Sequence, residues 1–232
     1  MRTVLSVIVP AYNEEETIVE ILEKVNAVNI SGLGVKKEII VVDDGSSDST
    51  NKILKKRKDL YTKLVRKKNG GKGSAIRRGI KEINGDFFII QDSDLEYDPE
   101  EYSKLLKPLI AGKADAVYGN RFKKASNKWK IPHHYFGNKI LSLIISVLYF
   151  RNIGDMETCY KCVNSDVIKS IKLRENGFRI EPEITAKLIK KGCRIMEVPI
   201  NYSPRSFEEG KKINWRDGIK AFFAIVKYRF TD

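Results

Sequence analysis

The sequence predicts an α/β fold, in which a mostly parallel central sheet carries helices on both faces within a single domain. Short apolar runs alternate along the chain with longer segments whose apolar residues recur at helical spacing. Several of these runs are uninterrupted, as expected for strands that are buried on both faces. Acidic or glycine-rich turns follow the runs directly, where connections from strand to helix are expected.

Length and composition indicate a globular protein with a substantial core. The chain has 232 residues, of which 42% are hydrophobic, so we expect no long disordered segment. It contains 43 Lys and Arg against 30 Asp and Glu, a formal net charge of +13. Such a surplus favours anionic partners such as nucleotides or an acidic membrane surface, although a Lys- and Glu-rich surface is also typical of thermophilic proteins. The basic residues are spread out and form no recognisable nucleic-acid module, so we expect no nucleic-acid partner.

Targeting signals and disulfides are not expected. The longest mainly apolar stretch, 140–150, is too short to cross a hydrocarbon core of about 30 Å as a helix. A strand-like run begins at Val4 and leaves no room for a signal peptide, so we expect a cytoplasmic protein. Cys159 and Cys162 form a C-x-x-C pair, but a zinc site would need further ligands from Cys193, His133 or His134 at unfamiliar spacing. Buried, reduced thiols are the expected alternative.

The first half of the chain contains five expected strands, and helical segments lie between them. The strands are 4–9, 38–42, 62–65, 87–90 and 114–119. Helical periodicity follows 14–17, continues through Leu54 in the next unit, and covers 74–83 in the third; Pro99 opens the fourth helix.

The second half adds one expected strand, 193–198, and several helices. A helix opened by Pro182 extends to Lys191, and the last helix covers about 215–228. Leu141, Ile144, Ile145 and Leu148 also recur at helical spacing. This segment is either an ordinary buried helix or a helix lying in the plane of a membrane surface.

Chemically distinctive residues follow the predicted parallel strands. Right-handed crossovers place the carboxyl ends of parallel strands at one edge of the sheet, where ligands bind in open α/β folds. That edge should bring together the segments 10–12, 43–44, 70–73 and 92–94 with Arg121. Lys72 lies among three glycines before a helix, a pattern that can bind an anion, although its spacing is not that of a P-loop.

Asp92 and Asp94 directly follow the apolar run 87–90. In a continuing strand their carboxylates would point to one face and repel each other, so they would need a cation between them or a raised pKa. Oxygen ligands of this kind suit Mg²⁺ or Mn²⁺. A solvated acidic turn is the alternative.

The combined motifs resemble the inverting family 2 glycosyltransferases with a GT-A fold, and among them the polyprenyl-phosphate (dolichol-phosphate mannosyltransferase-like) branch. The matching pieces occur in the family's order from Val7 to Tyr202: VIVPAYNEE, VVDDGSSDST, GGKG, QDSDLEYDP, GNRF, DMETCYK, FRIEPEIT and EVPINY. The resemblance implies a transferase that uses a nucleotide-sugar donor and a divalent cation, Mg²⁺ or Mn²⁺.

The resemblance also assigns site residues. Pro10, Tyr12 and Glu14 should line the nucleotide pocket, Val42 and Asp44 should hold the base, and Asp92, Ser93 and Asp94 should contact the ribose and diphosphate. The two aspartates, with Glu96 where the branch commonly has Gln, form the expected metal set. Arg121 matches an arginine near the donor phosphates, and Arg205 and Lys211 match a mobile segment, 203–212, that closes over the donor. We assign residues 1–122 to the nucleotide-sugar half and 123–232 to the acceptor half.

The acceptor is left open between two classes. A polyprenyl phosphate is already ionised and needs no general base, whereas a saccharide hydroxyl needs a carboxylate, for which Asp155 or Glu157 is the candidate. The basic residues Lys124, Lys128, Lys130, His133, His134 and Lys139 lie before or in the apolar helix and suit peripheral contact with an anionic membrane surface. A nucleotide-binding protein without catalysis is the third hypothesis.

Overall fold

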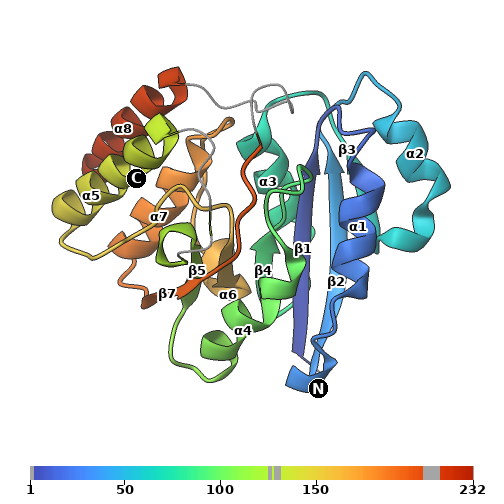
Figure 1. Ribbon diagram of the computed structural model, residues 1–232, viewed down its shortest axis with the longest axis horizontal. Helices are drawn as coiled ribbons and strands as arrows, with labels where there is room; N and C mark the ends of the chain where they lie inside the picture. Colours follow the sequence, from blue (N-terminus) through green and yellow to red (C-terminus); the bar gives the residue numbers. More distant parts are fainter. Residues whose placement is uncertain (1–2, 125–126, 128–131, 206–214, 232) are drawn as a thin grey trace.

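Seven strands form one sheet in the order β3-β2-β1-β4-β6-β5-β7, as the ribbon of the computed structural model shows (Figure 1). The structure describes residues 3–124, 127, 132–205 and 215–231. The strands are β1 (Thr3–Ala11), β2 (Val35–Asp43), β3 (Lys63–Arg66), β4 (Phe87–Ile90), β5 (Ala116–Asn120), β6 (Lys161–Asn164) and β7 (Ile195–Pro199). All six strands expected from the sequence are present, and β6 is additional.

The sheet is mostly parallel, as predicted. β1 pairs in parallel with β2 and β4, β2 with β3, and β5 with β7. β6 pairs antiparallel with both β4 and β5 and so separates them. The sequence analysis missed β6 because its four residues include a lysine, Lys161, which is fully buried here by partners from elsewhere in the fold.

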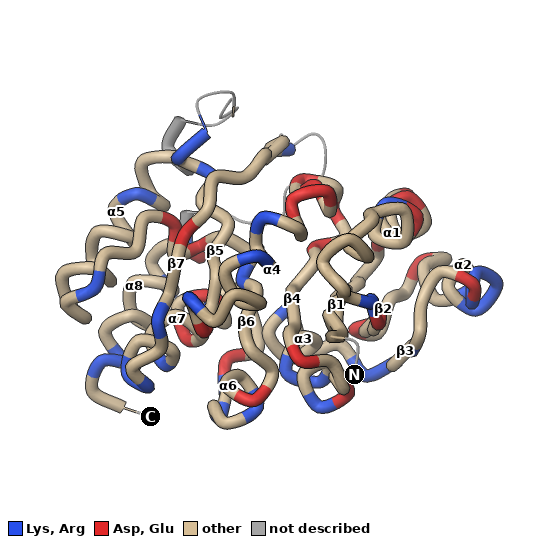
Figure 2. Tube along the Cα trace, turned by 90° about the horizontal axis from the view of Figure 1, so that it is seen from below, with Lys and Arg blue, Asp and Glu red and all other residues tan. Residues whose placement is uncertain are grey.

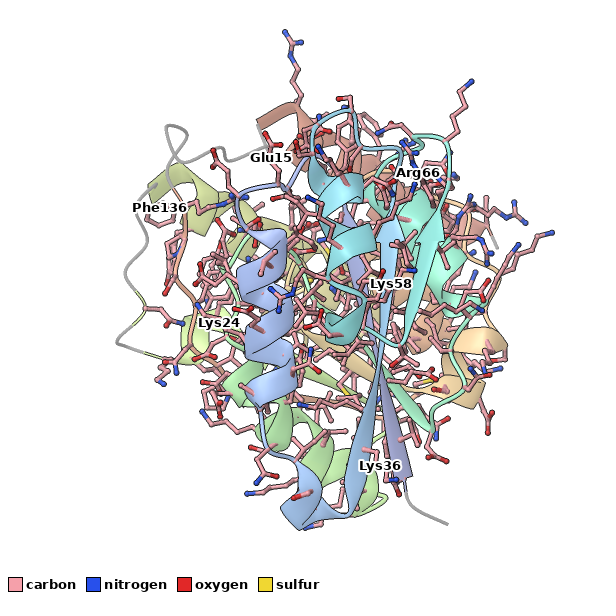
Figure 3. All side chains as sticks on the ribbon, turned by 90° about the vertical axis from the view of Figure 1, so that its right-hand side faces the viewer. Glu15, Lys24, Lys36, Lys58, Arg66 and Phe136 are labelled. Atoms are coloured by element: carbon pink, nitrogen blue, oxygen red, sulfur yellow. The ribbon has the colours of Figure 1, made fainter. Side chains whose placement is uncertain are left out.

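Helices cover both faces of the sheet. The α-helices are α1 (Ile18–Ala27), α2 (Thr50–Lys56), α3 (Lys72–Ile80), α4 (Tyr102–Ile110), α5 (Pro132–Tyr149), α6 (Ser165–Lys169), α7 (Ile180–Lys190) and α8 (Trp215–Phe230). Short 3₁₀ turns occur at Ser31–Leu33, Lys58–Leu60, Pro99–Glu101 and Arg121–Lys123. α1 and α4 lie on one face and α3 on the other, as two perpendicular views show (Figures 1 and 3).

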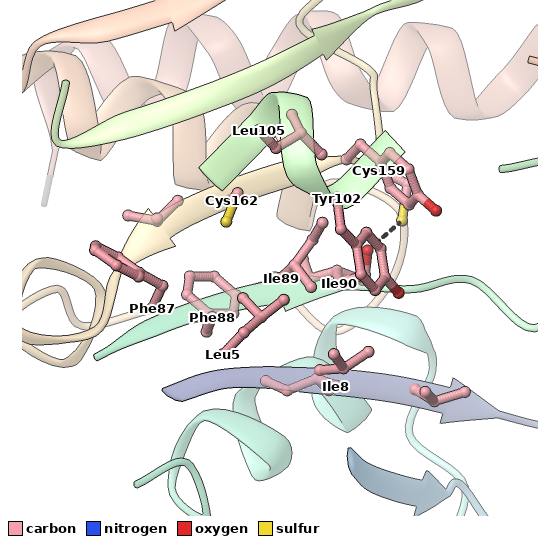
Figure 4. Close-up of a cluster of buried hydrophobic side chains, with 14 of the residues drawn as sticks. Leu5, Ile8, Phe87, Phe88, Ile89, Ile90, Tyr102, Leu105, Cys159 and Cys162 are labelled. Atoms are coloured by element: carbon pink, nitrogen blue, oxygen red, sulfur yellow. Dashed lines mark hydrogen bonds between the residues drawn. The ribbon is translucent and has the colours of Figure 1, made fainter. Parts of the chain in front are cut away.

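The main core lies between the sheet and these helices. Leu5 and Ile8 of β1, the four residues of β4, and Tyr102 and Leu105 of α4 are packed together in it (Figure 4). All four β4 side chains are buried, as the uninterrupted apolar run predicted. Cys159 also joins this core, and its thiol lies 3.6 Å from the carbonyl oxygen of Ile90.

A second apolar cluster joins α5, α7 and α8, and α5 and α8 lie side by side (Figure 1). Leu141 and Ile145 are buried in this cluster, while Ile144 and Leu148 pack partly against it. These four positions therefore form a face of α5 that packs in the core. Of the two alternatives left open by the sequence, a buried helix and a helix in the plane of a membrane surface, this face corresponds to the buried helix. α5 nevertheless has a second apolar face, because Phe136, Ile140, Leu143 and Val147 are all more than half exposed. Phe136 lies at the outer edge of the molecule in Figure 3.

Two global properties concern the distribution of charge and the length of the apolar helices. Lys and Arg are distributed over both halves of the molecule and do not gather on one face (Figure 2). Within the described part of the chain, no helix combines the length and the apolar character that crossing a membrane requires.

Candidate active site

A cavity of about 900 Å³ opens at the carboxyl edge of the sheet. Its polar wall contains most of the site residues expected from the sequence: Pro10, Tyr12, Glu14, Asp44, Lys72, Asp92, Ser93, Asp94, Glu96, Arg121 and Arg205. The convergence of these segments at one edge is therefore observed. Val42 is fully buried within β2 and does not line the cavity, so its side chain does not reach a ligand there.

The loop after β1 is held against the loop after β2. Asn13 has a positive φ of 53°, and its side-chain oxygen accepts a hydrogen bond from the backbone N–H of Ser47 at 2.9 Å. The backbone N–H of Glu14 donates to the Thr50 hydroxyl at 2.9 Å. The neighbouring residue Tyr12 is 41% exposed and lines the cavity, where a planar group can stack against its ring.

Asp44 holds the glycine loop. Its carboxylate accepts backbone N–H groups from Gly70 at 3.1 Å and Gly71 at 2.6 Å, and the Lys67 ammonium pairs with it. The observed role of Asp44 is thus to fix the loop 67–71 beside the cavity. Its expected contact with a nucleobase stays a prediction.

The glycines of this loop admit another backbone segment. A Cβ atom on Gly71 would lie 2.7 Å from the carbonyl oxygen of Asn176, and one on Gly73 would lie 2.5 Å from that of Glu175. The backbone N–H of Ser74 also donates to Asn176 at 3.0 Å. Close approach of the 175–177 backbone therefore accounts for these glycines, which the sequence analysis associated with an anion.

The turn after β4 places the two aspartates at the cavity. Leu95, a non-glycine residue with φ of 63°, turns the chain in the left-handed region, which costs of the order of 1 kcal/mol. Asp94 Oδ1 accepts the Glu96 backbone N–H at 3.1 Å, and the Ser93 hydroxyl donates to the Pro10 carbonyl at 3.2 Å. These local bonds hold the turn and the Asp94 carboxylate in place.

The electrostatics of the turn suit a cation. Burial, together with the charges of Asp92 and Glu96, raises the pKa of Asp94 to about 7. A divalent ion would remove that penalty, because it stabilises the ionised carboxylate. Among the described residues, however, no group of three or more His, Cys, Asp or Glu side chains has the arrangement of a metal site. Two carboxylates with substrate phosphates completing the shell match the usual binding of Mg²⁺.

Glu96 ties this turn to the segment after β7. One carboxylate oxygen accepts the Tyr202 hydroxyl at 2.7 Å, and the other accepts the Arg205 backbone N–H at 2.8 Å. Arg205 Nη2 lies 3.5 Å from Asp94 Oδ2. Both oxygens of Glu96 thus hold protein groups, and its inclusion in the metal set stays a prediction. Lys211 and most of the expected mobile segment lie outside the described residues.

Arg121 and Asp155 form a buried bidentate pair. Asp155 Oδ2 accepts the backbone N–H of Arg121 at 2.9 Å and its Nε at 2.8 Å, while Oδ1 accepts Nη2 at 2.7 Å. Asp155 is fully buried and does not line the cavity. In this position the carboxylate orients the arginine and does not face the cavity, and the expected role of Asp155 as a catalytic base stays a prediction.

A buried charge network that the sequence analysis missed lies beside Asp92. Lys72 Nζ is 2.8 Å from Asp92 Oδ2 and 3.5 Å from Glu181 Oε1, and Glu181 Oε2 accepts the Lys161 ammonium at 2.6 Å. Burial alone would lower the pKa of Lys72, but Asp92 and Glu181 raise it well above its ordinary value. The signal available in the sequence was weak, because Glu181 is one of several charged residues of α7 and Lys161 is the first residue of a four-residue strand.

Glu157 lines the same cavity. Burial raises its pKa to about 7, and the charges of Glu181 and Asp155 add to this, while Lys161 and Arg121 oppose it. Of the two carboxylates considered as a base, Glu157 is the one that faces the cavity.

The other end of the cavity is apolar. It lies between α5 and α8 and is lined by Ile140, Leu141, Ile144, Ile219, Phe222 and Phe223. Polar and apolar ends are parts of one continuous space, so a ligand with both kinds of group fits it. The three cysteines are buried free thiols, as expected, and only Cys159 borders the cavity.

Comparison with known proteins identifies the family. The sequence model described as glycosyl transferase family 2 matches residues 6–172. This chain belongs to glycosyltransferase family 2. The family resemblance and the enzyme class expected from the motifs are thereby confirmed.

Two of the relatives of this glycosyltransferase are archaeal proteins. It is 32% identical to a dolichol-phosphate mannosyltransferase of Pyrococcus furiosus, covering 89% of this chain but 58% of that protein. It is also 32% identical to an uncharacterised protein of Methanocaldococcus jannaschii, with 97% of this chain and 99% of that protein covered. The glycosyltransferase thus spans less than two thirds of the Pyrococcus enzyme.

Solved structures confirm the GT-A fold. Glucosyl-3-phosphoglycerate synthase from Mycobacterium tuberculosis, in complex with Mn²⁺, UDP and phosphoglyceric acid, matches with a TM-score of 0.73. The alignment covers 99% of this chain and 80% of that one at 18% identity. At this identity the likeness establishes the fold alone.

Proposed function

We propose that this chain transfers a sugar from a nucleotide-sugar donor to a polyprenyl phosphate, with a divalent cation held by Asp92 and Asp94. One observation carries the proposal: a single cavity joins the acidic turn to an apolar passage between α5 and α8. An isoprenoid chain needs an apolar passage, and its phosphate needs to meet the donor at the polar end. The dolichol-phosphate mannosyltransferase of Pyrococcus furiosus supports the same class of acceptor.

The residues at the polar end of the cavity would then have different roles in binding the donor and activating its diphosphate. A bound Mg²⁺ or Mn²⁺ would act as a Lewis acid on the diphosphate and offset charge on the leaving nucleotide. Arg121, oriented by Asp155, and Arg205 beside Asp94 would donate charge-assisted hydrogen bonds to phosphate oxygens. Lys72 would keep Asp92 oriented through its hydrogen bond. The acceptor phosphate is already ionised, so this reaction needs no general base.

The two halves of the chain would contribute different walls. Segments before residue 122 provide the acidic turn, Tyr12 and Arg121, while α5 and α8 provide the apolar end. This division supports a nucleotide-sugar half, 1–122, and an acceptor half, 123–232. The pairing of Lys72 with Glu181 joins the halves across the cavity.

We also propose that the exposed apolar face of α5 and α8 contacts a membrane surface peripherally, which would deliver the lipid acceptor. Leu143 and Val147 of α5 and Phe230 of α8 are exposed on this helix pair and do not line the cavity. Two of the basic residues expected to support membrane docking contact other parts of the protein. Lys124 contacts Asn201, and the Lys139 ammonium lies 4.5 Å from the centre of the Phe122 ring. The side chains of Lys128, Lys130, His133 and His134 lie outside the described part. The cytoplasmic location stays a prediction.

A saccharide hydroxyl is the second candidate acceptor. The observation that favours it is Glu157, a carboxylate at the cavity wall whose pKa is raised to about 7, close to the value a general base needs.

The test is a panel of nucleotide sugars, including UDP-glucose and GDP-mannose, offered with a polyprenyl phosphate or a soluble saccharide. Product formation would be followed by mass spectrometry with Mg²⁺, Mn²⁺ or chelator. We expect a glycosylated polyprenyl phosphate that appears only with metal. Transfer to the saccharide alone would favour the second candidate, and the absence of both donor hydrolysis and transfer would leave a nucleotide-binding protein.

Two double variants separate the cavity from the membrane surface. Ile219→Asp with Phe222→Asp changes the cavity wall and should reduce transfer even to a short, water-soluble prenyl phosphate. Leu143→Asp with Val147→Asp changes exposed side chains that do not line the cavity. It should reduce only binding to anionic liposomes and transfer to acceptor embedded in them. Equal effects of both variants on the soluble acceptor would contradict this separation.

A further inference from the structure

Within the described residues, the carboxyl oxygen Oε1 of Glu157 has no hydrogen-bond partner. This atom is buried, and no hydrogen bond or ion pair to the carboxyl group occurs within the described part of the chain. Leaving a buried polar atom unsatisfied costs roughly 1–3 kcal/mol, so such groups usually have a ligand or a structural reason. The side chain borders the active-site cavity, which makes a ligand the natural source of the missing partner.

Neighbouring cations are already committed to other acceptors. The Lys161 ammonium has three donors, and it contacts the carbonyl oxygens of Met156 and Thr158 and the carboxylate of Glu181. Arg121 directs Nε and Nη2 to Asp155. The charges of both buried ion pairs influence the pKa of Glu157.

The same network relates Glu157 to the donor site. The Lys72 ammonium joins Asp92 to Glu181, Glu181 pairs with Lys161, and Glu157 lines the same cavity as Lys72, Asp92 and Glu181. Asp92 is the carboxylate at which the diphosphate is expected. The group attached to that diphosphate would therefore be the first part of the substrate to meet Glu157.

Only one part of the proposed substrates can donate a hydrogen bond to the ionised form of this carboxyl group. Phosphates at neutral pH are acceptors and are repelled by carboxylates, and an isoprenoid chain has no polar hydrogen. The base and ribose are expected at the loops after β1 and β2, where Tyr12 and Asp44 lie. The hydroxyl groups of the hexose remain as donors.

We propose that Glu157 accepts a hydrogen bond from a hydroxyl group of the transferred sugar and is a specificity-determining residue for the donor. This inference rests on the proposed use of a nucleotide-sugar donor. A sugar epimer whose hydroxyl points elsewhere leaves the carboxyl group unsatisfied again. Sites built to bind a hydroxyl group discriminate strongly against analogues that lack it.

The first experiment compares donor and nucleotide binding. Titration calorimetry with Mn²⁺ would measure UDP and GDP against UDP-glucose and GDP-mannose for the wild type, Glu157→Ala, Glu157→Gln and the control Glu100→Gln. Glu100 is exposed and does not line the cavity. We expect Glu157→Ala to weaken binding of the preferred nucleotide sugar roughly 10- to 100-fold, as for loss of a hydrogen bond to a charged group. Binding of the matching nucleoside diphosphate should change less than about twofold, and Gln, which retains an acceptor oxygen, should restore part of the loss.

The second experiment uses deoxy-sugar analogues of the preferred donor to locate the hydroxyl group. One analogue should weaken binding to the wild type by a factor similar to that of Glu157→Ala, and should cause no further loss in that variant.

Three results would overturn the inference alone: an unchanged donor affinity in Glu157→Ala, an equal loss for nucleotide and nucleotide sugar, or a reduced kcat at unchanged donor affinity. The last would assign Glu157 to the base role for a hydroxyl acceptor. Failure of the wild type to bind any nucleotide sugar would instead refute the proposed function itself, and this inference with it.

Discussion

Replacement of Asp155 by Asn tests whether this residue orients Arg121 or acts as a base. The substitution removes a charge that is fully buried and bonded to three N–H groups of Arg121. Breaking a buried pair in this way leaves an uncompensated guanidinium and costs about 3–5 kcal/mol. For a domain of this length, 1 kcal/mol corresponds to roughly 2–4 °C in Tm, so we expect a fall of about 6–20 °C.

The chain offers a matched control in Asp115. Arg194 donates to it with the same three groups, the backbone N–H and Nε to Oδ2 and Nη2 to Oδ1, at 2.8, 3.1 and 2.8 Å. The side chains of that pair are 58% and 31% exposed, against 6% and 0% for Arg121 and Asp155. Exposed pairs contribute about 0–1 kcal/mol, so Asp115→Asn should lower the Tm by no more than about 4 °C.

The assay is thermal unfolding of both variants, with donor hydrolysis measured well below each midpoint. Asp155→Asn should lose stability and, because Arg121 is no longer oriented, also lose activity. If it kept the wild-type Tm while kcat collapsed, the orienting role would be refuted and the base role supported. Equal destabilisation by Asp155→Asn and Asp115→Asn would show that burial is not the deciding factor.

Three further predictions concern the same cavity. Asp92→Asn and Asp94→Asn should each lose nearly all turnover while the circular dichroism spectrum stays intact. The nucleotide affinity of each variant should also become insensitive to metal. An active Asp94→Asn variant, or full wild-type activity in excess chelator, would contradict the metal assignment. The raised pKa of Glu157 means that the folded state binds the extra proton between about pH 4.5 and 7, so its contribution to stability is present below this window and is lost as pH rises through it. Urea unfolding of Glu157→Gln should therefore lack up to about 3 kcal/mol of that pH dependence, and a pH profile identical to wild type would count against the shift. Arg205→Ala should raise the KM for the donor and reduce protection of the following segment from proteolysis by nucleotide with metal; unchanged kinetics would remove the support for closure.

The local pattern of the sequence was sufficient to predict most of the fold. β4 was predicted because a short, uninterrupted apolar run from Phe87 to Ile90 is typical of a strand that is buried on both faces. Parallel connectivity then predicted that Asp92 and Asp94 would meet Tyr12 and Arg121 at one edge, since right-handed crossovers place strand ends together. These inferences depend on periodicity and chain direction, which are properties of neighbouring residues.

Tertiary structure decided which face or partner each polar or apolar side chain has. Helical spacing showed that Leu141 and Ile145 share a face, but contacts with α7 and α8 determine that this face is buried. The sequence alone does not distinguish Asp155 from Glu157, because both are carboxylates and only Met156 separates them. In the fold, Asp155 pairs with Arg121 and Glu157 lines the cavity. The sequence around the two carboxylates does not show this difference, because Arg121 comes from a segment distant in the chain. Local sequence therefore determined the sheet and its acidic edge, while the chemical role of each charge depends on long-range contacts that no local pattern encodes.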